Sequence, residues 1–360
     1  MNKAIWVVLI IVLAVGAFMI WGTRDSQQDL ANQPGVQEPA NDRENRDGGG
    51  RVDYNAQWQA SAHAKVVENT VRDGCIQCHT EQGFINPDVK AEEITGPKAQ
   101  TCNACHDFSG ANNENKLRKV TPVSLPNGVV MDRGDSNLCV ACHNSRRNMQ
   151  DAATRAGRKA PHGSPEGDML MGTNAWEFGA DVVSYQNSAH TGFENACVVC
   201  HMAKSPPEGQ AGFNEVGGHT FRVKSNDAFN PNACIGCHPE TVSADRPAYG
   251  DYDGNKKMEG IQSEVEGLLE LLKAEIEKRI PGGGGKLSES HGNVVFLKAD
   301  GTEIPPEEMD EKLYLAAYNY FFVEADGSLG VHNPPYAVTL LQQSYKAITG
   351  KDVPNAEIRR

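Results

Sequence analysis

The sequence has few basic residues. Among its 360 residues, 34 are lysine or arginine and 47 are aspartate or glutamate, which gives a formal net charge of −13. Binding to nucleic acid requires clusters of basic side chains that neutralise phosphates, so this balance argues against a nucleic-acid partner. The acidity favours solubility and the electrostatic steering of complementary protein partners.

The sequence also has no cysteine outside one repeated pattern. All ten cysteines belong to five copies of Cys-x-x-Cys-His. Two thiols three positions apart can form thioethers with the vinyl groups of a haem, and the adjacent imidazole then binds the iron as its proximal ligand. A single Cys-x-x-Cys could be a redox dithiol or half of a zinc site, but five copies, each followed by histidine, argue against both. The pattern predicts five covalently bound haem c groups. The copies are motif 1 (Cys75, Cys78, His79), motif 2 (Cys102, Cys105, His106), motif 3 (Cys139, Cys142, His143), motif 4 (Cys197, Cys200, His201) and motif 5 (Cys234, Cys237, His238).

The motif region has little polypeptide for each haem. From residue 75 to residue 238 there are about 33 residues per motif, too few to enclose each macrocycle in a protein core of its own. We therefore expect the haems to contact one another and to supply much of the core as a haem stack.

The histidines outside the motifs are just sufficient to give every haem iron a second histidine ligand. Five of the eleven histidines are proximal, and bis-histidine coordination needs five more. The pattern aromatic-Gln-x-Ser-Ala-His occurs at residues 58–63 and 185–190, each time before a motif, and we interpret it as an internal repeat that presents its histidine to an iron. His291 lies in a polar loop and is expected to be solvated. The predicted distal ligands are His63, His162, His190, His219 and His332.

The N-terminus carries one long apolar run. Residues 4–22 are uncharged and follow Lys3, which fits either a transmembrane anchor or a cleaved signal peptide within residues 1–22. Residues 23–51 are polar and are expected to be a disordered linker. Both alternatives place the rest of the chain outside the cytoplasm. It would lie on the periplasmic side of the inner membrane if anchored, and be secreted or at the cell surface if cleaved.

The composition changes after motif 5. Apolar residues recur at helical spacing over 257–280, 306–323 and 334–349, with Pro281 and Gly350 as stop signals. A hairpin is predicted over 294–304, with its turn at Asp300-Gly301. These signals divide the exported part into a pentahaem domain (52–250) and a C-terminal helical region (251–360) that packs on the haems as an antiparallel bundle. A homodimer interface on these helices, or a haem-stacked polymer, is a further alternative.

Residues 251–255 resemble the first half of a calcium-binding loop. The sixth position of such a loop should be Gly but is Lys256, and the twelfth should be Glu but is Gln262. A polar turn that caps the following helix is therefore favoured, and a calcium ion is the alternative.

The chain resembles multihaem c-type cytochromes of the group that includes ammonia-forming cytochrome c nitrite reductase and hydroxylamine oxidoreductase-like proteins. The resemblance covers roughly residues 52–350 and implies a mainly α-helical fold with few strands and with haems in near-parallel and perpendicular pairs that conduct electrons. It rests on Trp58 with residues 61–63, on motifs 1, 3 and 4, on residues 161–163, 188–190 and 217–221, and on the closing stretch 326–334.

One departure from this group bears on function. The typical nitrite reductase uses Cys-x-x-Cys-Lys at its catalytic haem, whereas all five motifs here end in histidine. A haem iron with two histidines has no free position for nitrite, so we favour an electron carrier between membrane or periplasmic and extracytoplasmic redox partners over an enzyme. Two alternatives stay open: a nitrite- or hydroxylamine-type reductase with one open haem, flanked by Arg146, Arg147 and Tyr185, and a membrane-anchored quinol dehydrogenase.

Overall fold

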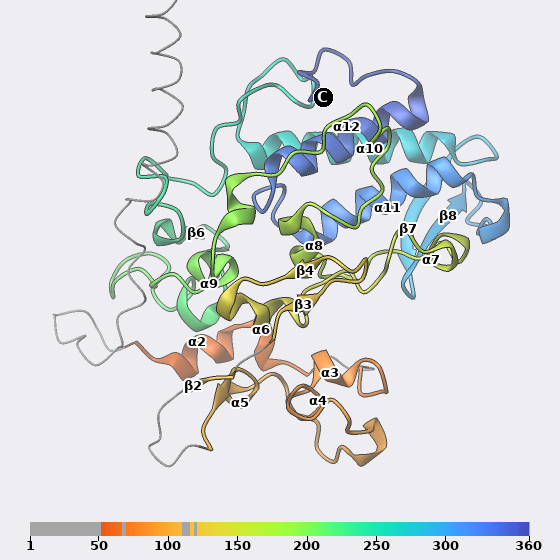
Figure 1. Cartoon of the computed structure of the whole chain (residues 1–360). Helices are drawn as coiled ribbons and strands as arrows, with labels where there is room; N and C mark the ends of the chain where they lie inside the picture. Colours follow the sequence, from red (N-terminus) through yellow and green to blue (C-terminus); the bar gives the residue numbers. More distant parts are fainter. Residues whose placement is uncertain (1–51, 67–69, 110–115, 119–120, 360) are drawn as a thin grey trace, which may run out of the picture. The chain divides into compact units, whose positions relative to one another are not determined.

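The computed structural model describes residues 52–66, 70–109, 116–118 and 121–359, which belong to one compact unit (Figure 1). The predicted N-terminal anchor or signal peptide and the linker up to residue 51 lie outside the described residues. Within the described residues, no helix is long and apolar enough to cross a membrane. The predicted division at residue 250 stays a prediction.

The described chain is mainly helical, as predicted. Short helices occupy the motif region, and three long helices follow it. The α-helices are α2 (Tyr54–Ala60), α3 (Ile76–His79), α4 (Glu81–Ile85), α5 (Cys102–Cys105), α6 (Asn137–Val140), α7 (Ala152–Ala156), α8 (Glu166–Met171), α9 (Ala196–His201), α10 (Ile261–Arg279), α11 (Glu311–Asp326) and α12 (Pro334–Thr349). The 3₁₀ turns are η2 (Ala62–Ala64), η3 (Ala91–Glu93), η4 (Gly134–Ser136), η5 (Ala189–Gly192), η6 (Gly218–Thr220), η7 (Pro231–Ala233) and η8 (Pro306–Glu308).

The strands of the described residues form antiparallel pairs, and no pair joins another. Three pairs have strands of two residues: β1 (His106–Asp107) with β2 (Lys116–Leu117), β3 (Val123–Ser124) with β4 (Val130–Met131), and β5 (Lys224–Ser225) with β6 (Ala228–Phe229). Only β7 (Gly285–Ser290) and β8 (Asn293–Lys298) make a longer hairpin. The sheet content is therefore local and leaves the helices and the motifs to define the fold.

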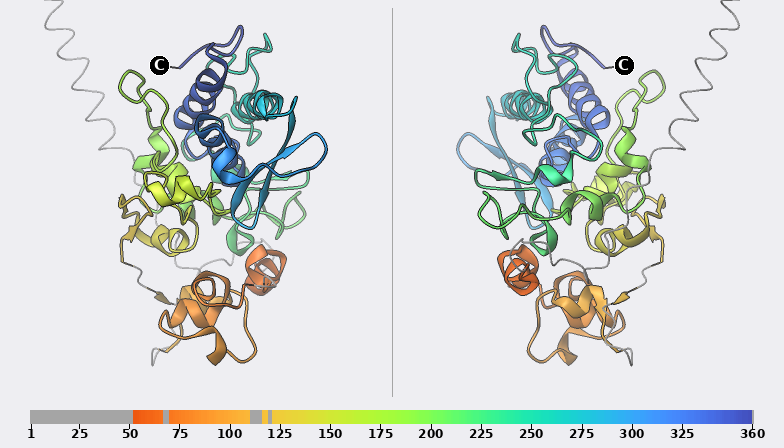
Figure 2. Two further views of the ribbon diagram at one scale, coloured as in Figure 1. Left: turned by 90° about the vertical axis from the view of Figure 1, so that its right-hand side faces the viewer. Right: turned by 90° about the vertical axis from the view of Figure 1, so that its left-hand side faces the viewer.

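The three long helices α10, α11 and α12 pack against one another, as predicted for the C-terminal region (Figure 2). Helix α12 begins at Pro334 and ends before Gly350, whose φ of 73° supplies the left-handed conformation of a helix C-terminus. Helix α11 begins later than predicted because Asp310 caps it: the Asp310 side chain accepts a hydrogen bond from the Leu313 amide.

The predicted hairpin over 294–304 is present, but β8 has a longer partner that the sequence did not indicate. Around Asp300-Gly301 the chain turns back, with an antiparallel bridge between Leu297 and Glu303 and backbone hydrogen bonds of 2.8 Å from Lys298 to Thr302 and from Ile304 to Phe296. On its other edge, β8 pairs along its whole length with β7, which precedes it. That turn lies at His291-Gly292, where φ is 52° and 75°, the left-handed values that a two-residue hairpin turn requires.

The apolar core of the described residues lies in the C-terminal half. The larger cluster of buried side chains begins at Met149 and is built mostly from α10, α11, α12 and the hairpin. A smaller cluster joins Leu125, Met131, Val140, Leu170 and Ala196. No described residue from 52 to 122 belongs to either cluster. The region of motifs 1 and 2 therefore has no apolar protein core of its own in the described chain.

Candidate haem-binding sites

Each motif is folded as one helical turn. The histidine amide donates to the carbonyl of the first cysteine in motif 1 (3.1 Å), motif 3 (2.8 Å) and motif 5 (2.8 Å), and the same bond closes α5 in motif 2. In motif 4 the turn is part of α9. Side chains three and four positions apart share one face of such a turn, so both thiols and the imidazole are presented together.

The structure brings each proximal histidine opposite one predicted distal histidine. The ring centres are 6.1 Å apart for His79 and His162, 6.2 Å for His106 and His219, 6.0 Å for His143 and His63, 5.9 Å for His201 and His332, and 6.3 Å for His238 and His190. An imidazole nitrogen binds a transition metal at about 2 Å, and its ring centre lies about 1 Å further out, so two imidazoles on opposite sides of one metal have centres roughly 6 Å apart. All five pairs fit an iron between the rings.

The two copies of the Ser-Ala-His repeat have the same backbone. Ser61 and Ser188 have nearly identical dihedral angles, with φ −78° and ψ 163° against φ −79° and ψ 169°. Each serine starts a 3₁₀ turn that carries the histidine, His63 in η2 and His190 in η5. Only the first copy follows a helix, α2; the residues directly before η5 in the second copy form no helix.

The distal position of His219 is supported by helix α2. The His219 amide donates to Gln57 Oε1 at 3.0 Å, and Gln57 Nε2 donates to Asn214 at 2.8 Å. Gln57 is 1% exposed. A Cβ on Gly218 would lie 2.4 Å from Gln57 Oε1, so glycine is needed for this close approach. The buried amide of α2 therefore fixes the turn that holds His219.

Burial favours the neutral form of two predicted distal histidines, the form that binds a metal. Burial, together with the charge of His143, lowers the pKa of His63 to about 4. Burial, together with the charge of Arg146, lowers the pKa of His162 to about 4. A neutral imidazole has a free nitrogen lone pair, so at neutral pH both side chains are available as ligands without losing a proton first.

Four of the paired histidines have a defined partner at Nδ1. His190 faces the carbonyl of Val331 and His201 that of Phe221, both at 2.9 Å. His143 faces Glu166 Oε1 at 3.2 Å, and His332 faces Asp326 Oδ1 at 2.6 Å. Burial alone would lower the pKa of His332, but the charge and hydrogen bond of Asp326 raise that pKa to about 9. These contacts fix which ring nitrogen, Nε2, points to the partner histidine.

Motif 3 lies beside three other motifs. The thiols of Cys78 and Cys142 are within hydrogen-bonding reach, and so are those of Cys139 and Cys197. Cys105 interacts electrostatically with both thiols of motif 3. The thiols of motif 5 act in the same way on Cys200 of motif 4. Motifs 1, 2 and 4 therefore adjoin motif 3, and motif 5 adjoins motif 4.

The candidate calcium loop is closed by its own backbone. Carboxylate oxygens of Asp251, Asp253 and Glu264 lie within 4.8 Å of one another. Glu264 therefore supplies the carboxylate that a calcium loop has at its twelfth position, where this sequence has Gln262. These oxygens accept backbone hydrogen bonds from the loop itself, among them Tyr252 N to Glu264 at 2.7 Å and Lys256 N to Asp251 at 2.8 Å. The cluster stabilises the loop before α10 but does not cap that helix as predicted: the Gln262 and Ser263 amides donate to Asp245 Oδ1, at 2.8 and 3.4 Å.

Two of the three side chains predicted to flank an open haem make hydrogen bonds with backbone carbonyls. Arg146 donates to the carbonyl of Cys142 at 3.0 Å. Tyr185 donates its hydroxyl to the Phe178 carbonyl at 2.9 Å and packs edge to face on Tyr336. The third, Arg147, has a buried Nε without a hydrogen-bond partner among the described residues.

His291, which the sequence predicts to be solvated, is exposed at the hairpin turn.

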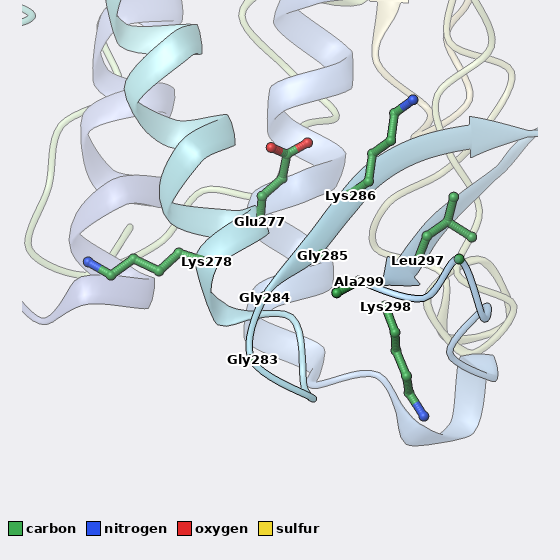
Figure 3. A pocket seen from close by; sticks show the side chains of 10 residues that line it. Glu277, Lys278, Gly283, Gly284, Gly285, Lys286, Leu297, Lys298 and Ala299 are labelled. Atoms are coloured by element: carbon green, nitrogen blue, oxygen red, sulfur yellow. The ribbon is translucent and has the colours of Figure 1, made fainter.

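A depression of about 540 Å³ lies between the C-terminal end of α10 and the β7–β8 hairpin (Figure 3). Its lining includes Gly283–Gly285 and three lysines, Lys278, Lys286 and Lys298, whose side chains point in different directions. No motif residue and no paired histidine lines it, so the depression is separate from the haem-binding sites.

Comparison with known proteins gives one family match and a likeness of fold. Residues 181–354, which contain motifs 4 and 5, match the family model of cytochrome c552. Solved structures that resemble the chain include the outer cell wall cytochrome OcwA, with a TM-score of 0.51 and 20% identity over 81% of this chain and 50% of that one. The chain resembles multihaem c-type cytochromes, in sequence over residues 181–354 and in its fold.

An undecahaem cytochrome from the S-layer of Carboxydothermus ferrireducens also aligns with this chain, with a TM-score of 0.42 and 18% identity over 82% of this chain and 40% of that one. The chain therefore spans about half the length of OcwA and less than half the length of the undecahaem cytochrome. No curated protein sequence matches it significantly. The family match supports covalently bound haem c in the residues that it covers, which include motifs 4 and 5.

Proposed function

We propose that the five motifs each bind one haem c and that each iron is held between the two imidazoles of one histidine pair. The observation that carries this proposal is the set of five ring pairs, all with centres between 5.9 and 6.3 Å apart. Each pair joins one motif histidine to one histidine outside the motifs, and no histidine is used twice. Coordination of five irons by ten histidines accounts for this arrangement.

The pairing favours electron transfer over reduction of a small substrate. A bound haem supplies reversible one-electron chemistry, and an iron with two histidine ligands has no free position for nitrite or hydroxylamine. A reductase would need one predicted distal histidine to lie away from its motif histidine. Instead, each of the five predicted distal histidines lies opposite a motif histidine. Arg146 and Tyr185 are also engaged in hydrogen bonds with backbone carbonyls rather than directed toward an open site.

The arrangement of the motifs supports a branched relay. Motif 3 adjoins motifs 1, 2 and 4, so groups attached there would lie next to three neighbours, with motif 5 reached through motif 4. Cys102 of motif 2 and Cys237 of motif 5 are exposed. We propose that motifs 2 and 5 lie at the ends where redox partners exchange electrons with the chain.

We also propose that this exchange takes place outside the cytoplasm. The apolar N-terminal run predicts export, and the fold is shared with OcwA, which is an outer cell wall cytochrome. The acidic net charge of −13 would steer basic or complementary redox proteins toward the chain.

The proposal is tested on the purified holoprotein. Intact mass and the pyridine haemochrome assay should give five haems per chain, and addition of nitrite or hydroxylamine should leave the visible spectrum of the oxidised protein unchanged. Fewer than five haems would contradict the count. A spectral change with nitrite would mean that one iron is open, and the reductase alternative would replace the relay.

A further inference from the structure

The histidine pair of motif 4 includes an imidazole, that of His332, which contacts a buried carboxylate. Nδ1 of His332 lies 2.6 Å from Oδ1 of Asp326, a charged acceptor. His190 and His201 have neutral carbonyl oxygens in the same position, at 2.9 Å. Hydrogen bonds to ionised acceptors are shorter and stronger than those to neutral ones, so His332 is the imidazole with the more strongly polarised N–H bond.

The surroundings of Asp326 protect this contact from water. The Asp326 side chain has no exposed surface, and that of His332 is 21% exposed. A second carboxylate, that of Glu166, lies beside His143. This contact is longer, at 3.2 Å, and the Glu166 side chain is 29% exposed. Charges interact more strongly where water is excluded, so the effect of Asp326 on its histidine exceeds that of Glu166.

The chain holds Asp326 in place at the end of α11. Gly327, with φ 68°, ends the helix in the left-handed conformation and turns the chain back toward Asp326. Ser328 donates its hydroxyl to Asp326 Oδ2 and accepts a hydrogen bond from the His332 amide at 3.2 Å. Gly330, with φ 86°, could not carry a Cβ without meeting Val265 at 2.8 Å. The loop from Asp326 to His332 is therefore closed around the carboxylate.

A carboxylate at Nδ1 makes an imidazole a stronger electron donor to the metal at Nε2. Stronger donation stabilises the oxidised state of an iron relative to its reduced state, which lowers its reduction potential. We propose that Asp326 lowers the reduction potential of the haem held by His201 and His332, and that Ser328 limits this effect by donating to the same carboxylate. Asp326 acts here through His332, as a positioning and tuning residue. The inference rests on the bis-histidine coordination proposed above.

The test is a redox titration of the holoprotein, followed by electron paramagnetic resonance, in the wild type and three variants. In Asp326→Asn, one haem should become easier to reduce: at a fixed potential its ratio of reduced to oxidised form should rise at least tenfold, an upward shift of about 59 mV. Ser328→Ala should shift the same haem downward, because the carboxylate loses a competing donor. Glu166→Gln is the matched control, and it should shift a different haem, by a smaller amount.

A general disturbance of the loop would shift the reduction potential in the same direction in Asp326→Asn and in Ser328→Ala. Opposite shifts in these two variants therefore distinguish tuning by the carboxylate from damage to the loop. The inference is overturned if no potential changes in Asp326→Asn, or if Ser328→Ala shifts upward. If Asp326→Asn does not incorporate its haems, Ser328→Ala alone decides, with a downward shift in support and any other result against. A wild type without five low-spin haems would instead refute the proposed function, before the variants are compared.

Discussion

The side chain of Asn333 is predicted to hold the C-terminal bundle to the turn that carries His190. Asn333 is fully buried. Its Oδ1 accepts from the Ser188 amide at 2.9 Å, and its Nδ2 donates to Asn187 Oδ1 at 2.8 Å and to the carbonyls of Met169 and Leu170 at 3.2 and 3.4 Å. Asn333→Ala removes all four bonds. Counting only the two shortest, each of which leaves an unsatisfied polar group at a cost of roughly 1–3 kcal/mol, the variant should lose about 2–6 kcal/mol of stability.

The assay is guanidinium unfolding of the holoprotein, followed by far-ultraviolet circular dichroism, with the slope and the midpoint fitted separately. The matched control is Asn86→Ala, an exposed asparagine whose side chain accepts one bond from the Asp88 amide at 3.3 Å. The control should change stability by about 0.5 kcal/mol or less. If Asn333→Ala is no more destabilising than Asn86→Ala, the buried network does not hold the bundle to the His190 turn.

Three further predictions follow from the same geometry. Removing the distal ligand of motif 3 in His63→Gly should convert one fifth of the low-spin haem signal to high spin, and added imidazole should restore it; an unchanged spectrum would mean that His63 is not a ligand. Gly330→Ala should destabilise the protein by about 1–3 kcal/mol, because of its φ of 86° and the contact of a Cβ with Val265 at 2.8 Å, whereas Gly327→Ala, with a φ of 68° and open space, should cost less in the same unfolding assay. His291→Asn should leave the haem spectrum unchanged, because His291 is exposed at a hairpin turn, and any loss of low-spin signal would contradict its assignment as a non-ligand.

The sequence predicts the local elements that carry strong signals. Helix α12 was predicted with the right bounds, because Pro334 suits the first turn of a helix and Gly350 adopts the left-handed conformation that ends one. The turn at Asp300-Gly301 carries the ordinary turn signal and forms as predicted. The pairing of β8 with β7 was not predicted, because β7 is largely polar and His291-Gly292 is an unusual turn pair. Asn333 precedes α12 at the position where asparagine often caps a helix, but its side chain makes no cap bond and instead accepts a hydrogen bond from the Ser188 amide.

The sequence also supplies the ten histidines but not their partners. Motif spacing is a local property, so the proximal positions follow from it directly. The pairs, in contrast, join segments that are far apart in the chain, such as His332 after α11 with His201 in α9. The Asp326 contact was missed although it is only six residues from His332, because it depends on the left-handed turn at Gly327.

The central claim, that every iron lies between two histidines, is tested most directly by the electron paramagnetic resonance spectrum of the oxidised holoprotein. The account predicts low-spin signals that integrate to five haems per chain, with no high-spin component. A high-spin component that integrates to one haem per chain would show that one of the five pairs does not close its iron, and would contradict the account.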